Sequence, residues 1–360
     1  MSCSGAALLQ NAGESVRQLI NRVIATPDKA LSTAEFFLAD WKVRLRTTCP
    51  KITEVYSSRL RSRKPLKASN SACLTLNLFE TTVLGWASPE SYSEWRGPPG
   101  HFESILTEAG LRGAYLKGYE CQEAGSDPCI IFDPRGQMGL QLFGNMIDLP
   151  PWDVGAPCRI LLNFAALSRG RSLVHAATLS MMDEGVLIVG PGGAGKSGTT
   201  LAGISTGLNS AGDDWVLICP TRPPTAFRAY NTFKQDRNHL ARIDGLAGAM
   251  AHMNPNRRNK LEFDPEDFFP GCLVERMRLH AILAPQVAYE PRTRLARVDP
   301  QFVFQKLAPS LWIQSPERPV SSFRFAAWLT RSLPTYNVFL SDEPSEIGHT
   351  IGRFIEGLIR

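Results

Sequence analysis

Apolar residues near the start of the chain recur with the period of a helix. Between residues 15 and 25 they fall three or four positions apart, and Pro27 is expected to end that helix. A capping-box pattern at Ser32 and Glu35 then precedes three apolar residues at a spacing of four, which predicts a second helix. These three residues are Phe37, Trp41 and Leu45.

In the middle of the chain the pattern changes to that of strands. Residues 129–132 and 138–143 are apolar runs on either side of Asp-Pro-Arg-Gly, a typical turn sequence. A helix is expected over residues 159–167 and a buried strand over residues 186–189. The later expected elements are a helix ending near 207, strands at 215–218, 279–284 and 338–340, and helices at 301–307, 321–330 and 347–358.

This alternation of strands and helices predicts an α/β fold with a mixed sheet flanked by helices. At 360 residues the chain is longer than one average domain. We expect a main domain over residues 151–360 and a smaller α+β region over residues 1–150. The boundary is soft, because the strands at 129–143 could join the main sheet.

A glycine-rich loop follows the expected strand at 186–189. Its sequence is Gly190-Pro-Gly-Gly-Ala-Gly-Lys-Ser197, the pattern of a phosphate-binding P-loop. Glycines leave room for backbone N–H groups to surround a phosphate chain, and the following helix directs its positive end to the same place. Lys196 would contact the β- and γ-phosphates, and the Ser197 hydroxyl would bind Mg²⁺. The alternative is a glycine-rich turn without a ligand.

Two adjacent acids, Asp213 and Asp214, follow the expected P-loop helix. Phosphoryl transfer to a hydroxyl needs a carboxylate near the metal and a base that orients the acceptor, and the pair could divide these tasks. The match to a Walker B motif is imperfect, since the apolar residues follow the acids instead of preceding them. The alternative is a helix-to-strand turn with solvated acids.

A single histidine, His175, lies fifteen residues before Gly190 in an apolar run. At the start of the strand that precedes the P-loop strand, it could hydrogen-bond an active-site carboxylate. The alternative is a core histidine whose hydrogen bonds are satisfied.

Composition narrows the class of protein without deciding it. The contents of 43% hydrophobic and 20% charged residues are those of a globular protein, and the net charge of +5 suits anionic ligands but does not indicate a nucleic-acid partner. Eight cysteines without a CxxC pair predict reduced thiols and a cytoplasmic location. The sequence contains neither a secretory signal nor an 18-residue apolar run, so no membrane span is expected.

The order of His175, GPGGAGKS and the Asp-Asp pair resembles the HPr kinase/phosphorylase family. The sequence is most similar to relatives in bacterial peptide-biosynthesis clusters, which include the lasso-peptide serine kinases. The resemblance covers about residues 130–360. Its further stretches are PWDVGAPCRILLNF at 151–164, LVHAA at 173–177, GDDWVLI at 212–218, YNTFK at 230–234, LHAILAPQV at 279–287 and LAPSLW at 307–312.

The resemblance implies an HPr-kinase-like P-loop fold and a role for each matching residue. Asp213 would take the proton of the acceptor hydroxyl, Asp214 would lie by the metal with Ser197, and His175 would support the acid pair. Tyr230 and Lys234 would lie near the phosphates or the acceptor. The residues that would bind ATP are Gly190, Pro191, Gly192, Gly193, Ala194, Gly195, Lys196, Ser197 and Gly198.

The sequence also departs from the family. The bifunctional enzymes carry a Glu after the P-loop serine, where this chain has Gly198, and the C-terminal glycine-rich signature associated with phosphorolysis is missing. Phosphorolysis of a phosphoserine and HPr as the substrate are therefore not expected. Kinship with this family suggests homo-oligomers, although no sequence feature fixes a stoichiometry.

Three functions remain open. The resemblance favours an ATP- and Mg²⁺-dependent kinase that phosphorylates a serine-type hydroxyl of a peptide or small protein. A P-loop kinase of a small metabolite would share every motif. A regulatory nucleotide-binding protein would hold or hydrolyse the nucleotide without transferring phosphate.

Overall fold

A computed structural model describes residues 3–60, 73–80, 100–115, 129–143, 155–246, 259–314 and 320–360, with single positions 248, 250, 253 and 255. The chain forms two compact units, which consist mainly of residues 1–168 and 169–360. The expected boundary near residue 150 thus lies before the helix α5 (Arg159–Leu167), which packs against strand β5 (Cys129–Asp133) of the first unit. Each unit is described by itself.

The first unit contains a mixed six-stranded sheet. The strands at 129–143 belong to this sheet and do not join that of the second unit. Across the sheet the order is β1 (Ser32–Leu38), β2 (Trp41–Thr47), β3 (Cys73–Glu80), β6 (Met138–Phe143), β5 and β4 (Arg112–Tyr115). The other elements are α1 (Cys3–Ala25), the 3-10 turn η1 (Asp28–Ala30), α2 (Pro50–Leu60) and α3 (His101–Glu108).

The predicted helix at the start of the chain is confirmed, and it packs against α3. Residues at its expected apolar positions, among them Val16 and Val23, share a core with Phe102 and Ile105 of α3. That core continues onto β5 and β6. The spacing of apolar residues on α1 therefore identified its buried face, except at Ile24, which is 61% exposed.

The second predicted helix, from Ser32 through Leu45, is wrong. The chain forms the antiparallel pair β1 and β2 there, with Leu38 opposite Trp41 and the turn at residues 39–40. A spacing of four is also a multiple of the strand period of two, so Trp41 and Leu45 lie on one buried face of β2. The position of the turn, where Ala39 has a φ of 54°, was decided by tertiary pairing.

The second unit contains a mixed eight-stranded sheet. Its main path runs through β15 (Arg294–Arg297), β16 (Thr335–Ser341), β14 (Arg276–Glu290), β11 (Thr225–Arg228), β10 (Val216–Cys219) and β7 (Ser172–Val174). Off this path, β9 (Glu184–Val189) pairs with β8 (Ala176–Met181) and runs parallel to β14. β14 in turn runs parallel to β16.

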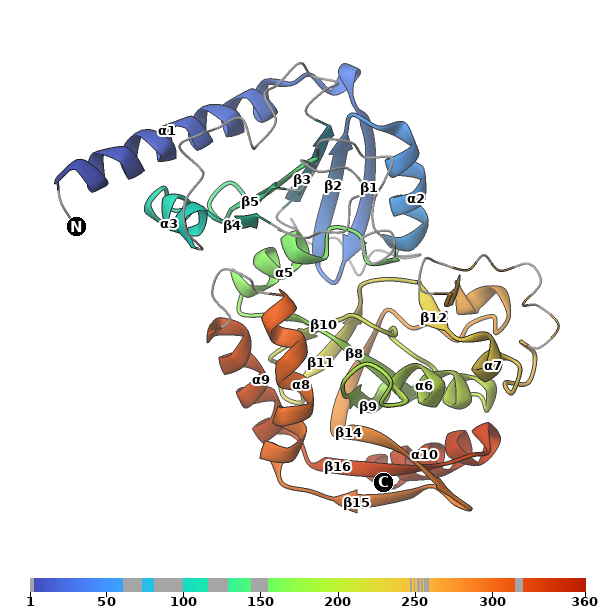
Figure 1. Ribbon diagram of the computed structural model, residues 1–360. Helices are drawn as coiled ribbons and strands as arrows, with labels where there is room; N and C mark the ends of the chain where they lie inside the picture. Colours follow the sequence, from blue (N-terminus) through green and yellow to red (C-terminus); the bar gives the residue numbers. More distant parts are fainter. Residues whose placement is uncertain are drawn as a thin grey trace. The chain divides into compact units, whose positions relative to one another are not determined.

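Helices cover both faces of this sheet (Figure 1). α6 (Lys196–Ser205) and α10 (Pro344–Ile359) share one core with Val186 and Ile188 of β9. α8 (Pro300–Gln314) and α9 (Val320–Ser332) share the other with Leu187 and Val189. Because successive residues of a strand point to opposite faces, the unbroken apolar run of β9 is what a strand buried on both sides requires.

Smaller elements complete the second unit. They are the strand pair β12 (Phe233–Gln235) and β13 (Leu261–Phe263), the short helix α7 (Arg237–Leu240) and the 3-10 turn η5 (Pro265–Asp267). The predicted class, an α/β fold with a mixed sheet flanked by helices, is confirmed. Within the described residues, no helix is long and apolar enough to cross a bilayer.

Candidate functional site

The P-loop, residues 190–197, lies at the carboxyl end of β9 and leads directly into α6. Gly193 and Gly195 have φ angles of 82° and 102°, which only glycine adopts without strain. A Cβ atom at Gly195 would also lie 2.7 Å from Cδ1 of Leu340. The glycines therefore permit the sharp bend that brings the start of α6 against the sheet.

Lys196 is buried at the start of α6 and folds back over its own loop. Its Nζ atom donates to the carbonyl oxygens of Gly190, at 2.8 Å, and Pro191, at 3.3 Å. Burial lowers the pKa of Lys196, whereas the nearby carboxylates of Asp213 and Asp214 act to raise it. The ammonium group is thus fixed at the P-loop and close to both acids.

The acid pair lies in a tight turn between α6 and β10. The backbone N–H of Trp215 donates to the carbonyl oxygen of Asp213 at 3.0 Å, and Asp214 between them has a φ of 74°. These features define a γ-turn of the strained type with positive φ at its central residue. Strain of this kind is concentrated at functional sites, where surrounding contacts maintain it.

Asp213 is buried, with 1% of its surface exposed. Burial, followed by the charge of Asp214, raises its pKa from 3.8 to about 6. Ser197, Lys196 and His175 act to lower it. Among the described residues neither carboxylate oxygen meets the geometry of a hydrogen bond, although the Ser197 hydroxyl lies beside it. A buried carboxylate with unsatisfied oxygens is costly, so this position is suited to receive a proton or a cation.

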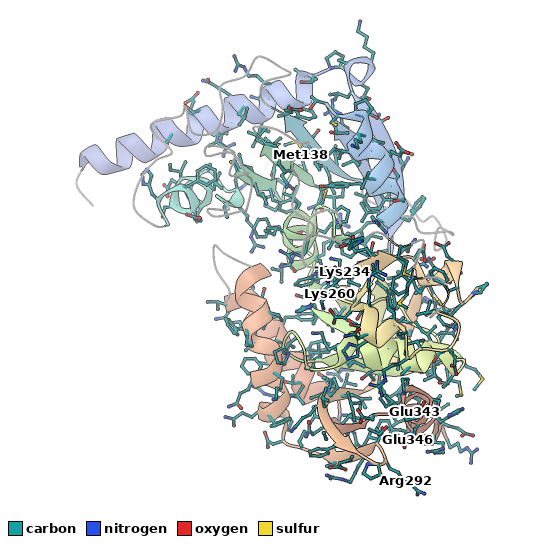
Figure 2. All side chains as sticks on the ribbon, turned by 45° about the vertical axis from the view of Figure 1, so that its right-hand side comes forward. Met138, Lys234, Lys260, Arg292, Glu343 and Glu346 are labelled. Carbon is teal, nitrogen blue, oxygen red and sulfur yellow. The ribbon has the colours of Figure 1, made fainter. Side chains whose placement is uncertain are left out.

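Asp214 is held by the side chains of His175 and Lys234. Its Oδ1 atom lies 2.8 Å from Nε2 of His175, and its Oδ2 atom lies 3.6 Å from Nζ of Lys234. Lys234, on β12, is also 4.0 Å from a carboxylate oxygen of Glu262 on β13. Figure 2 labels Lys234 together with Lys260, whose charge acts on Lys196.

His175 lies between β7 and β8, in the strand segment that precedes β9. Its ring stacks on that of Trp215, with centroids 4.8 Å apart and an angle of 26° between the planes. Trp215 and Glu262 are the site residues that sequence reasoning did not identify. Trp215 could have been predicted from its position directly after the acid pair. The sequence around Glu262 contains no pattern that indicates a site residue.

Two further expected residues lie close to this group. Tyr230 is buried in the segment that joins β11 to β12, and its carbonyl oxygen is 3.7 Å from where a Cβ atom of Gly212 would lie. A Cβ atom at Gly198 would lie 3.6 Å from the side-chain amide nitrogen of Gln235. The structure thus brings the predicted residues from His175 to Lys234 together around the start of α6.

The oxygen atoms of the site fit a magnesium ion that is also bound by phosphates. Mg²⁺ takes hard oxygen ligands and usually binds through one or two carboxylates together with substrate phosphates. Ser197 and the two aspartates supply such oxygens, and those of Asp213 are the unsatisfied ones. The described residues contain no cluster of three or more His, Cys, Asp or Glu that would bind a metal alone.

Comparisons with known proteins leave the site as the main guide to function. No protein-family model matches the chain, and no curated protein matches it. Among solved structures, the chain is similar to the Hpr(Ser) kinase/phosphatase from Coxiella burnetii. The identity is 16%, the match covers 52% of this chain and 94% of that chain, and the TM-score is 0.26. At these values the likeness carries no argument about activity.

Proposed function

We propose that this protein is an ATP- and Mg²⁺-dependent kinase that transfers the γ-phosphate to a serine-type hydroxyl of a peptide or small protein. The observation that carries the proposal is the position of Asp213, a buried carboxylate beside Ser197 and Lys196 of the P-loop. A carboxylate that can orient the acceptor hydroxyl beside a phosphate-binding loop is what transfer to a hydroxyl requires.

The P-loop would bind the phosphates. Its backbone N–H groups and the amino end of α6 favour anions, and Lys196 adds a full positive charge. Ser197 and Asp214 would hold the magnesium ion, which when bound neutralises charge on the phosphates. His175 and Lys234 keep the Asp214 carboxylate in place through their contacts with its two oxygen atoms.

Asp213 would accept the proton of the acceptor hydroxyl. A general base works best when its pKa is near the operating pH, and the pKa of about 6 leaves Asp213 mostly ionised at neutral pH. Because its carboxylate lies beside the Ser197 hydroxyl at the P-loop, it would orient the acceptor hydroxyl for in-line attack. Phosphorolysis is not part of this proposal, since Gly198 supplies no second carboxylate.

A peptide acceptor is proposed on the resemblance of LVHAA, GDDWVLI and YNTFK to kinases of peptide-biosynthesis clusters. The same resemblance supports assembly of several copies of the chain, and the eight cysteines without a CxxC pair support a cytoplasmic location. None of these three properties follows from the site geometry.

The test is transfer of labelled γ-phosphate from ATP to a degenerate library of serine-containing peptides. We expect transfer by the wild type and a loss of at least a hundredfold in Asp213→Asn, the lower range for removing a general base. Asp342→Asn, at an exposed site of the same unit, serves as the control. Transfer only to small hydroxylated metabolites, or hydrolysis without transfer, would replace the proposal with one of the two alternative functions.

A further inference from the structure

We propose that the edge of β14 beside the P-loop binds the acceptor peptide as an added β-strand. This inference rests on the proposed function, because it assumes that the acceptor is a peptide. It adds the place and the manner in which the peptide is recognised.

β14 continues past the end of its neighbour β9. Pairing between these parallel strands ends at Leu283 and Ile188, after which the chain of β9 turns into the P-loop. On its opposite side, β14 stays paired with β16 as far as Val287 and Leu340, with a later pair at Glu290 and Ser341. Beyond Leu283, no described strand pairs with the side of β14 that faced β9.

The direction of the backbone groups along β14 follows from one hydrogen bond. The N–H of Ile282 donates to the carbonyl oxygen of Pro334 at 2.9 Å, so Ile282 and every second residue after it point toward β16. The N–H and C=O groups of Val287 therefore point to the unpaired side. Pro285 also belongs to that side, which agrees with the confinement of proline to strand edges that need no donor.

The unpaired edge lies against the P-loop. A Cβ atom at Gly195 would be 3.9 Å from Cβ of Pro285 and 3.8 Å from Cγ2 of Val287. Val287 is nevertheless 42% exposed. Val287 is thus the accessible residue of this edge, and it is adjacent to the loop that would hold the γ-phosphate, whereas Pro285 is buried.

Side-chain contacts fix the connection that follows β14. The connection to β15 passes over the end of β16, where the N–H of Thr293 donates to Oε2 of Glu346 at 2.9 Å. The hydroxyl of Ser341 donates to the same oxygen at 2.7 Å. Figure 2 shows Glu343 and Glu346 at this end of the unit, near Arg292.

Only an extended chain matches the alternating N–H and C=O groups of a strand edge. Main-chain hydrogen bonds would then supply affinity without demanding a particular sequence. Because side chains alternate between the faces of a strand, every second residue of the peptide would lie on the P-loop face. A serine at one of these alternate positions would face the phosphates, whereas the residues directly before and after it would point to the other face.

The main test uses the wild-type enzyme and changes only the peptide. The probe is the best octapeptide substrate from a degenerate library with one central serine, N-methylated at one backbone amide at a time. We expect kcat/KM to fall roughly three- to tenfold at alternate amides, because each lost hydrogen bond costs about that factor. If kcat/KM fell at none of the amides, or fell equally at all of them, binding as an added strand would be ruled out while peptide phosphorylation would still hold. Failure of the unmodified octapeptide to accept phosphate would instead contradict the proposed function.

Two variants at one position provide a second measurement. Val287→Pro removes the N–H on the open edge, and Val287→Ala keeps that N–H while shortening the side chain. The measured quantity is kcat/KM for the octapeptide divided by that for N-acetylserinamide, which lacks neighbouring residues. We expect this ratio to fall about tenfold in Val287→Pro and less than twofold in Val287→Ala. Equal ratios in the two variants would count against strand addition.

Discussion

The indole of Trp215 stacks on the imidazole of His175, with ring centroids 4.8 Å apart, while Nε2 of the same imidazole lies 2.8 Å from Asp214. The histidine is therefore fixed by an aromatic face and by a carboxylate. Trp215 also donates its backbone N–H to Asp213 and so closes the turn that carries both acids. One residue thus positions the acid pair through its backbone and the histidine through its ring.

Replacing Trp215 with leucine should lower kcat while leaving the KM for ATP nearly unchanged. A stacked aromatic pair is worth about 0.5–1.5 kcal/mol beyond its buried area, which corresponds to a loss of up to about tenfold. Trp215→Phe keeps a stacking face and should retain most of the activity. Steady-state kinetics of both variants test this. A parallel rise in the KM for ATP, or equal losses in the two variants, would indicate general damage to the fold.

Asp213→Asn should raise the free energy of unfolding although it abolishes transfer. The pKa of this buried acid is raised from 3.8 to about 6, so its ionised form destabilises the folded state by about 3 kcal/mol. The penalty is absent below about pH 4, grows as the pH rises to about 6, and is complete above that. Urea unfolding at pH 5 and pH 8 should therefore show the larger gain at pH 8. A gain that is independent of pH would contradict the raised pKa.

Lys196→Ala should weaken binding of Mg-ATP at least tenfold, or about 1.4 kcal/mol, because the only P-loop lysine is lost. Isothermal titration calorimetry measures the affinity directly. Lys42→Ala is a matched control, since Lys42 forms an exposed ion pair with Glu35 in the other unit. Unchanged binding and unchanged turnover in Lys196→Ala would count against a nucleotide site at this loop.

Two glycines of α10 should respond oppositely to alanine. At Gly348 a Cβ atom would lie 2.3 Å from the carbonyl oxygen of Ala202 on α6, so Gly348→Ala should destabilise the second unit by about 1–3 kcal/mol. At Gly357 a Cβ atom would meet nothing within 4 Å, and the higher helix propensity of alanine should add up to about 1 kcal/mol. Thermal unfolding of both variants provides the comparison. Similar effects of the two substitutions would contradict the close approach of α6 and α10.

Local patterns predicted much of the fold. The helix at 159–167 and the strands at 129–132 and 138–143 lie where expected, because their apolar runs are bounded by clear turn residues. The failure at β1 and β2 arose where a spacing of four fits both a helix face and a strand face. Sequence separation hid Glu262, since it meets Lys234 through the pairing of β12 with β13.

The sequence by itself determined the P-loop, because a bend of glycines between a strand and a helix is a local property of the backbone. It also identified the acids and the histidine as candidates by residue type and order. Only the tertiary structure decided that Asp213 is buried without a partner in the described residues while Asp214 is paired, since burial and charge depend on contacts between distant segments. Only the tertiary structure also decided that one edge of β14 is unpaired beyond Leu283, because this depends on where the neighbouring strand β9 ends.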